Sequence, residues 1–206
     1  MPRPRFEKLP AEKRERILEA AAKEFTARGY DGASLNRILD EAGISKGAAY
    51  YYFDDKADLY ATAVGHYSQE LFAATAFYPA QLTAENFWEA ITEIYRQQFT
   101  GYAERPWVFG VVKAGGSSPA ELFTEGPLAE MIEQAQFLLL QLIRRGRDLG
   151  VIRDDVPEDL LLSLIVAVDD AHDRWIYAHG PELSPADLDE AAVRMGDVLR
   201  RVLSSG

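Results

Sequence analysis

Apolar residues recur every three or four positions along most of the chain, and glycine or proline interrupts each run. This recurrence matches the period of an α-helix, and we find no segment with the alternation typical of a half-buried strand. Breakers such as Gly29, Gly43 and Pro79 mark the ends of the first runs. The sequence therefore predicts an all-α fold of about nine helices, with three short helices before a larger helical body. Candidate helix starts lie near residues 10, 34, 45, 55, 84, 106, 118, 127, 157 and 184.

The composition excludes several classes of protein. The chain has no cysteine, so it has neither disulfides nor thiolate metal sites. Its longest apolar run, residues 137–143, contains Gln141 and is far shorter than the ~20 residues of a membrane helix. The first eight residues, MPRPRFEK, lack the apolar stretch of a secretory signal. We therefore expect a cytoplasmic protein that does not span a membrane.

The net charge of −11 is unevenly distributed. Residues 1–60 carry 11 Lys and Arg against 11 Asp and Glu, whereas residues 61–206 carry 11 against 22. The first segment also gathers cations in two groups, within residues 3–8 and 13–16. An acidic protein can bind nucleic acid when one lobe presents its cations, so this distribution is compatible with DNA binding by the first segment.

The second and third predicted helices are short, and the turn between them contains Gly43, which is the pattern of a helix-turn-helix. On a helical wheel of the third helix, Phe53 and Ala49 point to one side. The opposite arc carries Gly47, Ala48, Tyr51 and Tyr52, with Lys46 and Tyr50 on a flank. The small residues would let this helix enter a major groove, and the tyrosine hydroxyls and the lysine could bind phosphates. The alternative is that the tyrosines pack between helices with only their hydroxyls exposed.

The sequence from about residue 14 to residue 64 resembles the tetracycline-repressor (TetR) family of bacterial regulators. The matching positions are Arg16 to Ala21, Phe25, Gly29, Tyr30, Ser34, Leu35, Ile38, Ala42 to Gly47, Tyr50, Phe53 and Lys56 to Leu59. The resemblance implies a DNA-binding head, a divergent ligand-binding body and a homodimer. It further implies DNA recognition within residues 1–55, and ligand binding and dimerisation within residues 56–206.

The resemblance also implies roles for single residues of the head. Ser34, Ser45, Tyr50, Tyr52 and Lys56 match positions that contact phosphates, while Lys46, Gly47, Ala48 and Tyr51 match positions that face the bases or the groove. The sequence departs from the family at Ala49, where a larger apolar residue is usual, and at Tyr52, which is often histidine. The basic segment of residues 2–5 could enter a minor groove, or it could be a disordered terminus.

The last two predicted helices suit pairing between subunits. The final helix has one apolar stripe, which contains Leu188, Ala192, Met195 and Leu199. The helix before it is apolar over more than half of its circumference, and this surface includes Leu164, Val168 and Trp175. The resemblance implies that these two helices form a four-helix dimer interface. The apolar pattern alone fits the core of a monomer as well.

A ligand site in the body is expected among aromatic and polar residues. The helix starting near residue 84 carries Trp88, Tyr95, Gln98, Phe99 and Tyr102 within a narrow arc, and Trp107 and Phe137 follow in neighbouring helices. Asp169 and His172 face the same side of a helix, within its apolar arc. The aromatic stripe could equally be core. The acid–imidazole pair could satisfy itself at an interface, orient a polar or cationic effector or, with too few ligands for a confident site, bind a metal.

We find no catalytic motif, and no cofactor or metal site is expected. The sequence thus predicts a ligand-responsive transcriptional regulator that is not an enzyme. We expect a repressor that binds a palindromic operator as a homodimer and is released by a small-molecule effector. The alternative is a small-molecule-binding helical protein with lost or altered operator recognition. The sequence does not identify the effector, the operator or the regulated genes, and does not distinguish a repressor from an activator.

Overall fold

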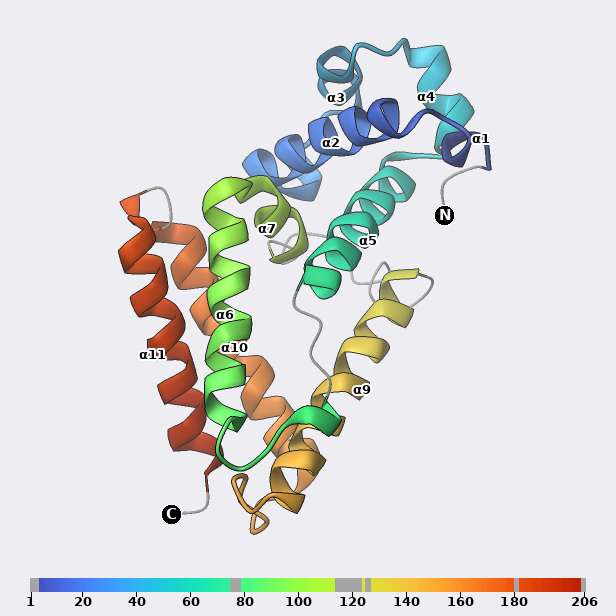
Figure 1. The fold of residues 1–206 in the computed structure, drawn as a ribbon. Coiled ribbons are helices and arrows are strands. Elements are labelled where there is room, and N and C mark those ends of the chain that lie inside the picture. Colours follow the sequence, from blue (N-terminus) through green and yellow to red (C-terminus); the bar gives the residue numbers. More distant parts are fainter. Residues whose placement is uncertain (1–3, 75–78, 114–123, 125–126, 180–181, 205–206) are drawn as a thin grey trace. The chain divides into compact units, whose positions relative to one another are not determined.

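The computed structural model describes residues 4–74, 79–113, 124, 127–179 and 182–204 (Figure 1). These residues form ten α-helices and one short 3-10 helix, and they include no strand, which confirms the predicted all-α fold. The α-helices are α1 (Pro4–Glu7), α2 (Ala11–Gly32), α3 (Leu35–Ala42), α4 (Lys46–Tyr52), α5 (Lys56–Ala74), α6 (Phe87–Glu104), α7 (Pro106–Lys113), α9 (Pro127–Asp148), α10 (Glu158–His179) and α11 (Pro185–Leu203). Within this described part, none is long and apolar enough to cross a membrane.

Several of the predicted helix starts can be checked against side-chain caps. The Ser184 hydroxyl accepts the amide hydrogen of Asp187, and the Asp187 carboxylate accepts that of Ser184, so α11 begins with a complete capping box. At α5 the Asp55 carboxylate accepts the Asp58 amide hydrogen at 2.8 Å, so the helix start expected near residue 55 also has a side-chain cap. Helix α1 was not expected, and the helix start expected near residue 118 lies outside the described residues.

The chain packs as two compact units. The head unit comprises Met1–Leu71 and Arg105–Ile132, and the body unit comprises Phe72–Glu104 and Glu133–Gly206. The two units are defined by helix packing and do not test the functional division. Helix α7, for example, groups with the first helices because it packs on α2. The functional division expected at residue 55 stays a prediction.

The head unit is held together by a single apolar core. Ile17, Phe25, Ile38 and Phe53 are at most 2% exposed, and they come from α2, from α3 and from the residue that follows α4. Burial of such side chains contributes about 1.5–3 kcal/mol each, so this core dominates the stability of the unit.

A polar cluster around Glu15 also joins the helices of the head unit. The Glu15 carboxylate accepts a hydrogen bond from the buried Tyr67 hydroxyl at 3.0 Å and pairs with the Arg105 guanidinium at 3.2 Å. The Nε2 atom of His66 lies 3.0 Å from Oε2 of Glu15, and Arg105 also pairs with Glu70. The cluster therefore ties α2 and α5 to the residue that precedes α7.

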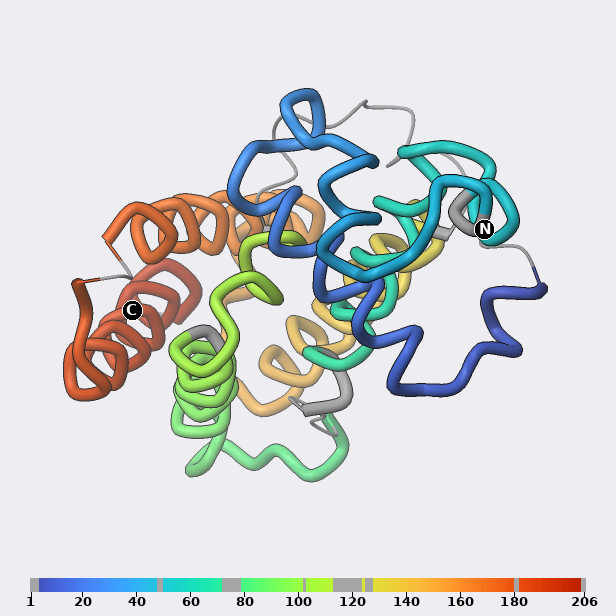
Figure 2. Tube along the Cα trace, turned by 90° about the horizontal axis from the view of Figure 1, so that it is seen from above, coloured from blue at the N-terminus to red at the C-terminus, as the bar shows by residue number. Residues whose placement is uncertain are grey.

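In the body unit, α6 and α11 lie side by side (Figures 1 and 2). The stripe of α11 that the sequence marked as apolar is buried here, with Ala192 and Met195 at most 1% exposed. Arg96 of α6 pairs with Asp189 of α11 at 2.5 Å beside this contact. Helix α10 packs on α11 as well, so three helices share the core of the body unit.

Candidate nucleic-acid interface

The turn between α3 and α4 has the geometry that a helix-turn-helix requires. Gly43 adopts φ 65°, a left-handed conformation that glycine accepts without steric strain. Its amide donates to the Asp40 carbonyl and the amide of Ile44 donates to the Leu39 carbonyl, which is the Schellman pattern. Ile44 is 9% exposed, so the turn is also anchored in the head core.

Helix α4 presents an outer face to solvent. Tyr50 and Tyr51 are 59% and 47% exposed, and Lys46 and Gly47 are exposed as well. A Cβ placed on Gly47 would meet no atom within 4 Å, so the backbone of α4 is open to close approach there. Ala48 belongs to α4, but its side chain and that of Ala49 lie outside the described residues.

Tyr52 does not face outward as the helical wheel indicated. It is 8% exposed and belongs to the head core, where its ring lies 6.3 Å from that of Phe6. The expectation was wrong because α1, which the sequence analysis did not predict, places Phe6 against both Tyr52 and Phe53. The alternative of a tyrosine packed between helices fits Tyr52, and a phosphate contact by its hydroxyl stays a prediction.

The basic segment at the N-terminus packs in part on the recognition helix. Arg5 lies in α1, and its guanidinium carbon is 4.2 Å from the centroid of the exposed Tyr51 ring. Insertion of Arg5 into a minor groove would therefore break its contact with the Tyr51 ring. Residues 1–3 lie outside the described residues.

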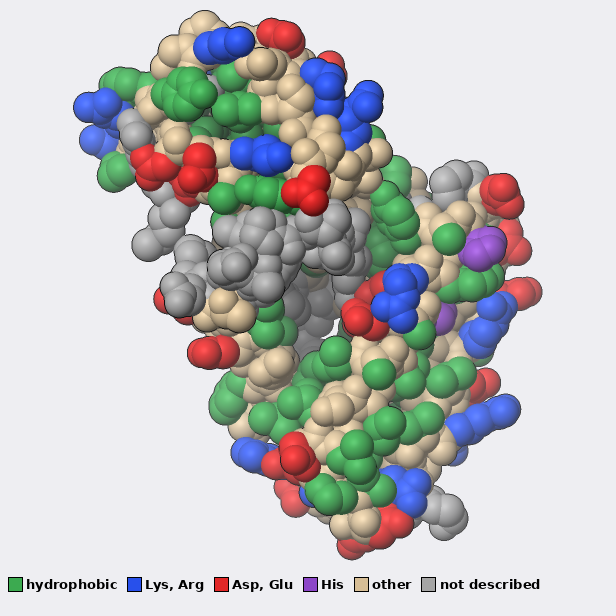
Figure 3. Space-filling model, turned by 180° about the vertical axis from the view of Figure 1, so that it is seen from behind, with side chains coloured by type: hydrophobic (Ala, Val, Ile, Leu, Met, Phe, Trp, Pro, Cys, Tyr) green, Lys and Arg blue, Asp and Glu red, His purple; other side chains and the backbone are tan. Residues whose placement is uncertain are grey.

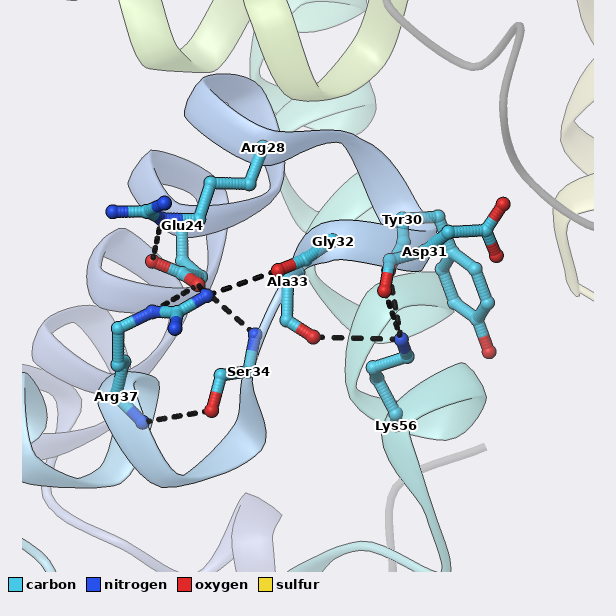
Figure 4. Close-up of polar contacts among 9 residues, drawn as sticks. All are labelled: Glu24, Arg28, Tyr30, Asp31, Gly32, Ala33, Ser34, Arg37 and Lys56. Atoms are coloured by element: carbon cyan, nitrogen blue, oxygen red, sulfur yellow. Dashed lines mark hydrogen bonds and ion pairs between the residues drawn. The ribbon is translucent and has the colours of Figure 1, made fainter.

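Ser34 and Lys56, both expected to contact phosphates, make separate polar contacts near the start of α3 (Figure 4). Ser34 is the N-cap of α3, and its hydroxyl oxygen accepts the Arg37 amide hydrogen at 3.5 Å. The Lys56 ammonium donates to the carbonyl of Tyr30 at 2.8 Å and to those of Asp31 and Ala33 at 3.4 Å. Lys56 is thus engaged with the backbone of its own chain. Ser45 is exposed just before α4.

A hollow of about 580 Å³ lies elsewhere in the head unit, between α1, α2 and α5. Its lining includes the carboxylates of Glu7, Glu12 and Glu15, with Arg14 and His66. Three carboxylates disfavour a phosphate backbone, so this hollow is a poor candidate for DNA and the α3–α4 surface stays the predicted one.

Comparison with known proteins identifies this head. The family model "Bacterial regulatory proteins, tetR family" matches residues 17–63, which run from α2 into α5. The chain is 30% identical to the HTH-type transcriptional repressor AcnR of Corynebacterium efficiens over 196 residues, 91% of this chain and 96% of that protein. The chain belongs to the TetR family.

Two further comparisons agree with this assignment. AcnR of Corynebacterium diphtheriae is 27% identical over 76% of each chain. The structure of the regulator FadR from Bacillus subtilis, solved in complex with stearoyl-CoA, superposes with a TM-score of 0.73 and 19% identity over 89% of this chain and 96% of FadR. This TetR-family protein is therefore a DNA-binding transcriptional regulator and not an enzyme.

In the body unit of this TetR-family protein, five of the predicted ligand residues lie on two packed helices. Tyr95, Gln98 and Phe99 lie on α6, and Asp169 and His172 lie on α10. The Tyr95 hydroxyl donates to Asp169 at 3.2 Å, and the Phe99 ring stacks on His172 with centroids 5.2 Å apart. Burial, followed by the negative charge of Asp169, raises the pKa of Tyr95 well above its ordinary value.

Three of the other four predicted ligand residues lie apart from this group. Trp88 packs on Phe87 at the start of α6. Trp107 belongs to the head unit, where its ring lies beside Lys23, and Phe137 is 58% exposed on α9. The side chain of Tyr102 lies outside the described residues.

Asp169 and His172 do not form the mutual pair that their spacing suggested. Asp169 is bonded to Tyr95, and neither ring nitrogen of His172 has a hydrogen-bond partner of standard geometry among the described residues. Burial lowers the pKa of His172, Asp169 acts in the opposite direction, and Arg194 lowers it further. The described residues hold no group of three or more potential metal ligands.

The residues predicted for the dimer interface separate into two sets. Leu188, Ala192, Met195 and Leu199 of α11 are at most 4% exposed within one chain, so they offer no surface to a second chain. The monomer-core alternative therefore fits these four. On α10, by contrast, Leu164 and Trp175 are 36% and 38% exposed, with Val168 half-buried between them. Hydrophobic side chains gather on the face of the body seen in Figure 3.

Two contacts that organise the head leave no signal in the sequence. Glu24 of α2 pairs with Arg37 of α3, with its Oε1 2.7 Å from Nε of the arginine. Neither residue was singled out, because an ion pair across two helices leaves no periodic signal. The packing of Phe6 under Tyr52 and Phe53 was missed for the same reason.

Proposed function

We propose that this protein is a repressor that binds a palindromic operator as a homodimer and is released by a small-molecule effector. Residues 1–55 would recognise DNA, and residues 56–206 would bind the effector and the second subunit. The observation that carries the proposal is the outer face of α4, with Tyr50 and Tyr51 exposed beside Lys46 and Gly47. The names of the AcnR relatives, which are repressors, support the direction of regulation.

Binding to DNA can be measured directly. The purified protein is used to select duplexes from a random pool at low salt, and the affinity for the enriched duplex is then followed as salt rises. We expect a palindrome with half-sites about one helical turn or more apart. We also expect the logarithm of the affinity to fall linearly with the logarithm of the salt concentration, because phosphate contacts release counterions.

The same selection separates the two candidate functions. Enrichment of one sequence supports operator recognition. Weak binding without any preferred sequence would instead support the alternative, a ligand-binding protein whose operator recognition is lost. Absence of any binding at low salt would contradict the proposed function.

The proposed homodimer rests on an apolar stripe of α10. Leu160, Leu164, Val168, Ala171 and Trp175 follow one another at spacings of three and four, and all except Val168 are exposed. The stripe lies one position from the buried residues Leu161, Ile165 and Ile176, so the two faces of α10 are distinct. Replacement of Leu164 by Glu should convert dimers to monomers in analytical ultracentrifugation, whereas the same change at the exposed Ser163 should not.

The proposed effector site lies between α6 and α10, around Tyr95, Gln98, Phe99, Asp169 and His172. FadR, which shares the fold, was solved with a ligand, and this supports a ligand site within such a body. A library of small molecules can be screened for release of the selected duplex. Asp169→Asn should change the concentration of a hit needed for release, and unchanged release would place the effector elsewhere.

A further inference from the structure

The backbone between α2 and α3 leaves several polar groups without helical partners. Gly29 adopts φ 66° and ψ 173°, which interrupts the helical geometry, and Ala33 and Ser34 are extended. Carbonyls near a helix end must find other donors. We call residues 29–34 the α2–α3 junction.

Two cations of the head bind every carbonyl of residues 30 to 33 (Figure 4). Lys56 takes three of them, those of Tyr30, Asp31 and Ala33. Arg37 takes the fourth, since its Nη2 donates to the Gly32 carbonyl at 2.9 Å. The ammonium of Lys56 also lies 4.5 Å from the centroid of the Tyr30 ring, which adds a cation–π contact.

The last amide of the junction is bound by an anion. Ser34 N–H donates to Glu24 Oε1 at 2.9 Å, and the same oxygen pairs with the Arg37 guanidinium at 2.5 Å. In a capping box, a glutamate three residues after the N-cap accepts this amide hydrogen. Here that position holds Arg37, and Glu24 of α2 takes the role of the glutamate while Arg37 holds it in place.

The surroundings of Glu24 favour its charged form. Its side chain is only 13% exposed, and Arg28 lies 3.5 Å from its second oxygen. Burial alone would raise the pKa of Glu24, but the hydrogen bonds from Arg37 and from the Ser34 amide, with the charges of Arg37 and Arg28, together lower it.

We propose that Glu24, Arg37 and Lys56 are positioning residues for DNA binding, and that the two cations act by fixing the α2–α3 junction and not by contacting phosphates. The proposal rests on the proposed function. The junction carries Ser34 and leads directly into α3, which positions α4 through the Gly43 turn. A shift of the junction would therefore move both the predicted phosphate contact and the recognition helix.

The replacement Glu24→Gln separates positioning from direct contact by the sign of its effect. Removal of a negative charge from a DNA-binding head strengthens binding if electrostatics alone matter, and it would also free Arg37 for a phosphate. If Glu24 acts by positioning, the affinity for the selected duplex falls instead, by about tenfold, which corresponds to about 1.4 kcal/mol. The matched control is Glu41→Gln on the exposed surface of α3, which should strengthen binding or leave it unchanged.

The salt dependence of binding separates the roles of the cations. Loss of one phosphate contact reduces the slope of log affinity against log salt by about 0.9. We expect this reduction for Lys46→Gln on α4, whereas Arg37→Gln and Lys56→Gln should lower the affinity by about tenfold with an unchanged slope. Arg37→Lys should bind as weakly as Arg37→Gln, because one ammonium cannot reproduce the forked guanidinium contacts.

DNA affinities are measured well below the thermal midpoint of each variant, and circular dichroism confirms that each variant is folded. Differences in affinity then do not reflect differences in global stability. Amide exchange supplies a second readout without DNA, since Ser34 should exchange faster in Glu24→Gln. Stronger or unchanged binding by Glu24→Gln, or a reduced slope for Arg37→Gln and Lys56→Gln, would overturn the positioning role while leaving the proposed function intact. If the unmodified protein bound no duplex, the proposed function itself would fail, and the positioning role with it.

Discussion

Two close helix contacts, one in each unit, are built from a glycine that faces a threonine. In the head unit Gly110 of α7 lies against Thr26 of α2, and in the body unit Gly196 of α11 lies against Thr92 of α6. In each case a Cβ on the glycine would overlap the threonine side chain, so the missing side chain allows the helices to approach.

The two contacts differ in how the threonine is held. The Thr26 hydroxyl donates to the Trp107 carbonyl at 3.1 Å, so it bonds across the contact to α7. The Thr92 hydroxyl donates to the Trp88 carbonyl at 3.0 Å, within its own helix. The threonine of the head contact thus adds a hydrogen bond between helices to the packing, whereas the threonine of the body contact bonds within its own helix.

The largest effect is expected for Gly110→Ala. The new Cβ would lie 2.7 Å from the Thr26 hydroxyl oxygen and 3.0 Å from its Cβ, and it would also overlap Cγ2. No rotation of the threonine side chain removes all three contacts, so α2 and α7 must separate. Overpacking of this kind costs about 1–3 kcal/mol, and we expect about 2 kcal/mol in chemical denaturation.

The control for Gly110→Ala is Gly65→Ala on α5 of the same unit. A Cβ at Gly65 would meet no atom within 4 Å, so this variant should gain up to about 1 kcal/mol from the higher helix propensity of alanine. Equal stabilities for the two variants would show that α2 and α7 are not in tight contact.

A smaller effect is expected for Gly196→Ala in the body unit, about 1 kcal/mol. Here the new Cβ would overlap only the Thr92 hydroxyl oxygen, since the Cβ of Thr92 lies at 3.3 Å. Rotation of the threonine removes the overlap and sacrifices the bond to Trp88. Gly101→Ala on α6, where a Cβ has open space, is the control, and a loss as large as that of Gly110→Ala would contradict this difference.

The parts of this structure that sequence predicted are those with local signals. The Gly43 turn and the helix start at Ser184 depend on residues within five positions of one another, and both were predicted. By contrast, Gly110 and Thr26 are 84 positions apart, and a glycine within a helix does not reveal what it faces. Sequence therefore indicated where helices begin and end, but not which of them approach closely.

The candidate site shows the same limit. A helical wheel placed Tyr51 on the outer arc and Tyr50 on its flank, and both are exposed, because a wheel needs only the period of the helix. It failed for Tyr52 because the covering side chain, Phe6, comes from another helix. The apolar stripe of α11, which contains Met195, was likewise found, but periodicity cannot say whether its partner is α6 of the same chain or a second subunit.

Truncation of the facing threonine should relieve the overlap more completely in the body contact than in the head contact. The expected difference in unfolding free energy is smaller than those above. Thr92→Ala removes the hydroxyl oxygen that a Cβ on Gly196 would overlap. The unfolding free energy of the Gly196→Ala, Thr92→Ala double variant should therefore be within about 0.5 kcal/mol of that of Thr92→Ala alone. Thr26→Ala leaves the Cβ contact of 3.0 Å, so a larger difference should remain in the head between the double variant with Gly110→Ala and Thr26→Ala alone. Thermodynamic cycles by urea denaturation give both values, and equal differences would show that the Cβ contact in the head does not matter.

The last comparison concerns the dependence of stability on pH. Burial lowers the pKa of His172 below its ordinary value of 6.5, so the unfolded chain takes up this proton first as the pH falls. Stability from His172 is therefore complete above about pH 6.5 and is lost as the pH falls toward the lower, folded pKa, by at most about 1.4 kcal/mol per pH unit. Glu24 of the head has a lowered pKa as well, but its contribution is lost only below about pH 4.5.

His172→Phe keeps a ring against Phe99 and should flatten the pH dependence between pH 6.5 and 5, measured by urea denaturation against the unmodified chain. All other ionisable groups are common to both chains, so identical slopes would mean that the imidazole binds a proton as readily in the folded body as in the unfolded chain.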